Sequence, residues 1–190
     1  MAAADAVLRR EGIRYVVIGG QAIAREAATT THDVDVMVAT ADYPRTISQL
    51  QRDRDLVYDW GNDQTARFRI RSQGGVPLDI VNAATFSGNK TGEEFFAYLA
   101  EKGSSVTDGI AYATPEMVWY TRLLTKRWRT YAEKIVTNVI DGVAPGRLRE
   151  VEAIATRFGT ETSIKARIAY VREELARPDV ESLAGSRTGA

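Results

Sequence analysis

Cysteine is absent from the 190 residues of this chain. That absence excludes disulfides, zinc sites built on thiolates, and thiol nucleophiles. Long apolar runs are missing too, so no segment is long enough to span a bilayer and no membrane partner is expected. Residues 1–5 lack the basic flank and apolar stretch of a secretory signal. These absences favour a globular protein that works in a reducing cytoplasm.

Net charge is also missing, because 25 lysines and arginines balance 25 aspartates and glutamates. The overall balance therefore says nothing about a nucleic-acid partner. The distribution along the chain is less even. Between 122 and 134 the basic residues are Arg122, Lys126, Arg127, Arg129 and Lys134, against the single acid Glu133. A local basic face on a neutral protein can steer a polyanion to one site.

The first 114 residues alternate between helical and strand patterns, and the pattern from there to the tail is helical. Expected helices cover 4–11, 21–28, 43–52 and 92–102, and expected strands cover 14–18, 33–38, 65–71, 76–81 and 110–113. Thr114, Pro115 and Glu116 are suited to a helix cap, a first helical position and a first turn. Helix is expected from there to about 175, with a turn at 142–146. The predicted organisation is a core of 1–114, a helical extension of 115–176 and a flexible tail of 177–190.

Three aspartates stand in strand patterns that predict a metal site. Asp33 and Asp35 alternate with apolar residues, so both carboxylates point to one face of their strand. Two neighbouring carboxylates repel each other unless a cation lies between them, and magnesium prefers such hard oxygen ligands. Asp79 lies inside an apolar strand, where burial of an acid is costly without a partner. A neighbouring strand that carries a metal pair would provide that partner.

Gly19 and Gly20 end the strand expected at 14–18. Glycines let backbone N–H groups approach an anion closely, and the N-terminus of a following helix favours phosphate. A phosphate cradle, an acidic pair and a third acid are the parts of two-metal phosphoryl transfer. Arg67 and Arg69 alternate on the strand before Asp79, so they either grip phosphate or form a solvated sheet face.

At these residues, over about 13–82, the chain resembles the DNA polymerase β-like nucleotidyltransferase superfamily. That family follows Gly-Gly-Ser/Thr with about a dozen residues, an Asp-x-Asp strand and a third acid. The resemblance implies an α+β fold, a mixed β-sheet with flanking helices that forms a nucleotidyltransferase core, plus a C-terminal helical bundle. It also implies two magnesium ions held by Asp33 and Asp35, with Asp79 on the second ion and helping to deprotonate the acceptor hydroxyl. Gln21 stands where the family usually has a hydroxyl residue, which leaves phosphate binding there to the backbone.

The C-terminal half is similar to toxins of the abortive-infection AbiEii and MenT type, which continue with a lysine-bearing helix and then an aspartate. Lys126 and Asp141 match those positions, and Thr31 matches the threonine before the paired acids. The resemblance implies transfer of a nucleoside monophosphate from a nucleoside triphosphate (ATP or another NTP) to an acceptor hydroxyl, with the tRNA 3′ end as acceptor and a cognate antitoxin as partner. Lys126 and Asp141 would lie roughly 22 Å apart on an unbroken helix. Both can reach one site only if the chain bends within 127–134.

Two alternatives stay open on the same residues. Antibiotic-modifying nucleotidyltransferases of the lincosamide or aminoglycoside type also place a Thr-x-Asp pattern after a Gly-Gly turn, as in Thr31-His32-Asp33. A catalytically inactive relative that binds a nucleotide or a partner protein is the third reading, and the intact acids argue against it. The base of the nucleotide and the identity of the acceptor have no signature in the sequence.

Overall fold

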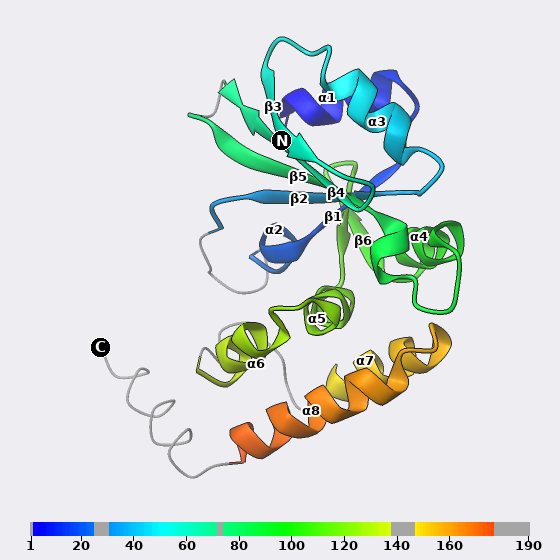
Figure 1. The fold of residues 1–190 in the computed structure, drawn as a ribbon, viewed down its shortest axis with the longest axis vertical. Coiled ribbons are helices and arrows are strands. Elements are labelled where there is room, and N and C mark those ends of the chain that lie inside the picture. The colour runs from blue at the N-terminus through cyan, green and yellow to red at the C-terminus, as the bar shows by residue number, and fades with distance from the viewer. Residues whose placement is uncertain (1, 25–30, 72–73, 138–146, 177–190) are drawn as a thin grey trace.

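A seven-stranded mixed sheet lies between two groups of helices (Figure 1). The computed structural model of the chain describes residues 2–24, 31–71, 74–137 and 147–176. The strand order is β3-β4-β5-β2-β1-β7-β6. The strands are β1 Tyr15–Ile18, β2 Val34–Val38, β3 Leu56–Gly61, β4 Thr65–Ile70, β5 Val76–Asn82, β6 Ser104–Thr107 and β7 Ile110–Ala113. The β2–β5 and β1–β7 pairs are parallel, and the other neighbours are antiparallel.

Helices cover the two faces of the sheet unequally. The helices are α1 Ala2–Arg10, α2 Gly19–Ile23, α3 Tyr43–Leu50, the 3-10 helix η2 Ala83–Phe86, α4 Gly92–Glu101, α5 Pro115–Leu124, α6 Trp128–Thr137, α7 Arg147–Arg157 and α8 Glu161–Leu175. Helices α1 and α3 pack on one face, in a cluster with Phe68 and Ile80. Helices α2, α4 and α5 pack on the other face with Met37 and Val81, and α7 and α8 extend that second cluster away from the sheet (Figure 1).

The predicted α+β class, a mixed sheet with flanking helices and C-terminal helices, is confirmed. Every strand expected from the sequence is present, but β3 and β6 were not expected. A signal for β6 existed, since Asp108 and Gly109 both have positive φ in the turn before β7. Asp-Gly is the dipeptide that such tight hairpin turns favour. Strand β3 lies at the edge of the sheet, and its sequence lacks clear alternation of apolar and polar residues.

The helical region begins as predicted, with the Thr114 side chain capping α5 and Pro115 at its first position. The break that follows lies at 125–127, earlier than the expected bend, because α6 runs without interruption through most of 127–134. A second break that was not expected separates α7 from α8 at Gly159, whose φ is +66°. The expected turn at 142–146, Asp141 and the tail of 177–190 lie outside the described residues. None of the helices in the described ranges is both apolar enough and long enough for a bilayer.

Candidate active site

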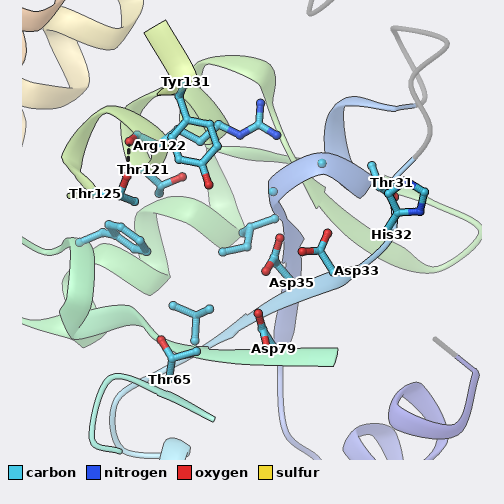
Figure 2. Close-up of a pocket in the computed structure, with 15 residues that line it drawn as sticks. Thr31, His32, Asp33, Asp35, Thr65, Asp79, Thr121, Arg122, Thr125 and Tyr131 are labelled. Atoms are coloured by element: carbon cyan, nitrogen blue, oxygen red, sulfur yellow. Dashed lines mark hydrogen bonds between the residues drawn. The ribbon is translucent and has the colours of Figure 1, made fainter. Parts of the chain in front are cut away.

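The three predicted aspartates come together on one face of the sheet. Strands β2 and β5 pair in parallel with Asp35 directly opposite Asp79, and Asp33 lies one residue before β2 on the same face. One carboxylate oxygen from each of the three lies within 4.8 Å of the others. Figure 2 shows the three side chains pointing toward one another. The arrangement follows from strand alternation combined with this register.

The acids mark the place where the two strands emerge from beneath the helices. Two residues farther along the same face, Met37 and Val81 are buried in the hydrophobic cluster under α2, α4 and α5. Asp79 is itself buried, with 9% of its surface exposed, while Asp33 and Asp35 are half-buried. The carboxylates therefore form the floor of an opening and are neither on a flat surface nor in the core.

That opening is a cavity of about 470 Å³, within the range of roughly 300–1,000 Å³ that is usual for small-molecule sites. Besides the three acids, it is lined by Ile18, Gly19, Gly20, Thr31, His32, Thr65, Val81, Phe86, Thr121, Arg122, Thr125 and Tyr131. These residues come from the ends of β1 and η2, the starts of α2 and β4, strands β2 and β5, helices α5 and α6, and the segments just before β2 and just after α5. The C-terminal helices thus form one wall, and the sheet forms the floor.

Gly19 and Gly20 are required by close packing at the site. Gly19 has φ of +66°, and a Cβ there would overlap Oδ2 of Asp35. A Cβ at Gly20 would lie 2.6 Å from Cγ2 of Thr31. The glycines were predicted for backbone approach to phosphate. The structure adds a steric reason, because only glycine leaves room for both the Asp35 carboxylate and the Thr31 side chain.

The electrostatics of the acids fit a cation. Burial, followed by the charges of Asp33 and Asp79, raises the pKa of Asp35 from 3.8 to about 7, against the opposing influence of Arg122 and Arg67. A divalent ion among these carboxylates would instead lower their pKa values, because it favours their charged forms. The donors are hard oxygens, as magnesium prefers. In the part of the chain that the structure describes, the buried Oγ1 of Thr31 has no hydrogen-bond partner, so a further polar group in this cavity is unsatisfied.

Arg67 and Arg69 have different neighbours, although they share one face of β4. Arg67 donates from Nε to Oδ1 of Asp79 at 2.7 Å and from Nη2 to Oδ2 at 2.6 Å. These hydrogen bonds raise the pKa of Arg67 further above its ordinary value. Arg69 instead donates to Asp59 on β3. Neither arginine is among the residues that line the cavity. Arg67 therefore holds the third acid, and Arg69 belongs to the neighbouring sheet surface.

The cation on the helical wall of the cavity differs from the one expected. Lys126 is exposed in the turn between α5 and α6 and does not line the cavity, while Arg122 does. The Arg122 guanidinium carbon lies 5.1 Å from the ring centre of Trp119 and 5.2 Å from that of Tyr131. Figure 2 shows Arg122 and Tyr131 across the cavity from the acids. The basic segment of 122–134 was a signal for a cation here, but only the end of α5 at Leu124 decides which member faces the site.

Of the remaining predicted residues, some line the cavity and others do not. Thr31 lines the cavity, and Gln21, half-buried in α2, does not. Asp141 lies outside the described residues. His32, Thr121, Thr125 and Tyr131 line the cavity without having been predicted as site residues. These four residues line the cavity because the segment before β2 and helices α5 and α6 lie around the same opening.

Comparisons with known proteins add a fold-level similarity. No family model matches the chain, and no curated protein matches it. A crystal structure of ANT(2'')-Ia in complex with adenylyl-2''-tobramycin is similar over 92% of this chain and 96% of that chain, at 15% identity and a TM-score of 0.48. A solution structure of the antibiotic-resistance factor ANT(2'')-Ia gives 15% identity, 92% and 90% coverage and a TM-score of 0.46. JHP933 from Helicobacter pylori gives 12% identity, 99% and 93% coverage and a TM-score of 0.39. Since each TM-score is below 0.5, a function for this chain must rest on its own residues.

Proposed function

We propose that the chain is a magnesium-dependent nucleotidyltransferase, which moves a nucleoside monophosphate from a nucleoside triphosphate to an acceptor hydroxyl. One observation carries the proposal: Asp33, Asp35 and Asp79 offer oxygens within 4.8 Å of one another on the floor of a cavity. Such a group of acids is costly without a cation, and divalent ions clamped by carboxylates are the basis of two-metal phosphoryl transfer.

The three acids have distinct roles in this proposal. Asp33 and Asp35 would hold magnesium, and Asp79 would join the second ion and take up the proton of the acceptor hydroxyl. Bound magnesium supplies neutralisation of the phosphate charge and polarisation of the reacting oxygens. The acceptor oxygen forms a bond to the α-phosphorus, the bond from that phosphorus to the β-phosphate bridging oxygen breaks, and pyrophosphate leaves.

Arg122 is the residue we assign to the triphosphate. A Cβ placed on Gly20 would lie 3.8 Å from its Nη2, so its guanidinium and the Gly19-Gly20 turn share one side of the cavity. A guanidinium offers several fixed donors that match phosphate oxygens. The open backbone at the two glycines allows close approach of the same group. The β- and γ-phosphates would therefore lie on this side of the acids.

For the acceptor we propose the 3′ end of tRNA, with the chain as the toxin of a toxin-antitoxin pair. Support comes from the sequence resemblance and from the basic residues Lys126, Arg127 and Arg129 beside the cavity wall, all of which are exposed. Lys126 would meet the RNA or the distal phosphate, and Asp141 would orient that lysine. A small-molecule acceptor, as for antibiotic-modifying enzymes, is the alternative that the experiment must separate.

The test is incubation with magnesium, each α-labelled nucleoside triphosphate in turn, and total tRNA. We expect label in RNA with one preferred nucleotide and release of pyrophosphate. If label appears in a small molecule, and only when an aminoglycoside or lincosamide is added, the acceptor is that small molecule and not RNA. The proposed reaction type would still hold. No label in either arm, from protein that is folded, would refute the proposed function.

Two variants make the test specific. Asp33→Asn removes a charge from the proposed metal site and should lower the rate by several orders of magnitude. Asp59→Asn is the matched control, because Asp59 is an acid of the same sheet that pairs with Arg69 and lies outside the group of three. It should keep nearly the full rate. An equal loss in both variants would point to general damage.

A further inference from the structure

A single row of side chains crosses the sheet from the proposed phosphate side to its edge. Ile18 on β1 lies opposite Asp35, Asp35 opposite Asp79, and Asp79 opposite Arg67. Arg67 in turn lies opposite Trp60 on β3. The glycine turn directly follows Ile18, so the acids occupy the middle of the row. The Gly19-Gly20 turn is at one end, and Arg67 with Trp60 is at the other.

A β-bulge places Trp60 on the same face as the acids. The pairing of β3 with β4 changes register between Tyr58 and Trp60. Before the change, Tyr58 lies opposite Phe68 and contacts its ring edge-on, on the face covered by α1 and α3. Regular alternation would turn Trp60 to that same face, two residues farther on. The extra residue at the bulge reverses this, and bulges commonly re-aim side chains beside active sites.

Trp60 is an exposed aromatic residue with a charged neighbour. Its exposed fraction is 47%, which is large for a tryptophan. The guanidinium carbon of Arg67 lies 5.9 Å from its ring centre, in cation–π contact. Among the described residues, β3 and β4 contribute nothing to the hydrophobic cluster under the helices on this face. The indole and the guanidinium therefore form a shelf that is open to solvent and leads directly to Asp79.

We propose that this shelf, Trp60 with Arg67, binds the 3′-terminal nucleotide of an RNA acceptor: its base would stack on Trp60, and its phosphate would pair with Arg67. The inference rests on the proposed function. In phosphoryl transfer the attacking and leaving oxygens lie roughly in line with the phosphorus between them. If pyrophosphate leaves toward Gly19-Gly20 and Arg122, the acceptor hydroxyl must arrive from the opposite side of the acids. That side is the end of the row that Arg67 and Trp60 occupy.

Charge favours an RNA acceptor over a polycationic one. Arg69 is balanced by Asp59, and Arg67 is balanced by Asp79. When a divalent cation takes up the charge of Asp79, the Arg67 charge becomes available to an anion of the acceptor. A phosphodiester complements that charge, whereas an aminoglycoside with several ammonium groups would be repelled. Stacking of a base on an aromatic side chain beside a cationic group is the usual way in which proteins hold single-stranded nucleic acid.

The experiment measures binding of two ligands separately. The first is a nucleoside triphosphate with magnesium, and the second is a single-stranded tetraribonucleotide that ends in a 3′-adenosine. Trp60→Leu should weaken the tetranucleotide roughly tenfold to a hundredfold, as loss of one stacked base predicts, and should leave the triphosphate unchanged. Trp60→Phe should recover most of the tetranucleotide affinity. In steady-state assays Trp60→Leu should raise the KM for RNA more than it lowers kcat.

Tyr58→Leu is the matched control. Tyr58 is 41% exposed and lies on the same strand, but it packs on the opposite face of the sheet. Its replacement should leave both affinities unchanged. Equal tetranucleotide affinity in wild type and Trp60→Leu would overturn the inference, as would weaker triphosphate binding in Trp60→Leu or tighter binding of tobramycin than of RNA on the shelf. Failure of wild type to bind any triphosphate with magnesium would instead count against the proposed function.

Discussion

Replacement of Asp35 by asparagine should stabilise the metal-free protein while it abolishes the response to magnesium. The amide keeps the shape of the carboxylate but carries no charge. Asp35 lies beside two other acids, and its surroundings raise its pKa from 3.8 to about 7. At pH 8 the folded wild type must keep this carboxylate ionised in a place that disfavours its charge. The asparagine variant has no such cost.

The size of the effect follows from the shifted pKa. A carboxyl whose pKa is higher in the folded than in the unfolded state stabilises the fold fully below the unfolded value, near pH 4, and this contribution is lost as pH rises through about 7. A difference of roughly three pH units, at about 1.36 kcal/mol each, gives an upper limit of about 4 kcal/mol. For a chain of this length that corresponds to a rise in Tm of at most about 16 °C.

The assay is thermal or urea unfolding in a chelator at pH 5 and pH 8, repeated with magnesium. We expect Asp35→Asn to exceed wild type in stability at pH 8 by more than at pH 5. Magnesium should raise the Tm of wild type but not that of Asp35→Asn. Asp59→Asn, which removes a paired acid on β3, should show neither the gain at pH 8 nor a loss of the magnesium response. A metal-free Asp35→Asn variant that is no more stable than wild type at pH 8 would refute the reasoning about the crowded acids.

Three other outcomes are expected from contacts at the site. Arg122→Met should raise the KM for the nucleoside triphosphate tenfold or more in initial-rate assays, because it removes a charged donor from the cavity. Lys126→Met should raise this KM less. A larger effect of Lys126→Met would mean that the lysine, and not Arg122, binds the phosphates. Gly19→Ala should lose the stabilisation by magnesium, because its Cβ would overlap the Asp35 carboxylate. Gly12 has a similar φ of +65° but open space around it, so Gly12→Ala should lower the free energy of unfolding in urea by only about 1 kcal/mol and keep the stabilisation by magnesium. Arg67→Met should tighten magnesium binding in calorimetry without nucleotide, since it removes the cation that holds both oxygens of the third acid; weaker binding would mean that Arg67 assists the metal.

Local patterns in the sequence determined much of the fold and the centre of the site. Alternation around Asp33 and Asp35 was enough to place both on one strand face, because the side-chain period of a strand is two residues. The Thr114-Pro115 pair marked the start of α5, because capping depends on a few adjacent residues. Asp79 within an apolar strand was enough to require a polar partner nearby. None of these inferences needed a residue distant in sequence.

Tertiary structure alone decided which residues complete the site. Arg67 meets Asp79 because of the β4–β5 register, and Trp60 shares their face because a bulge reverses its orientation. Arg122 faces the cavity, and Lys126 does not, because α5 ends at Leu124. These positions depend on how separate segments pair and where a helix stops against its neighbours. A shift of one residue in register turns every side chain of a strand to the other face, and one extra residue in a bulge does the same locally. Spacing along the chain therefore predicts the face of a side chain within one element, while its partner across elements is set only when the sheet and helices have packed.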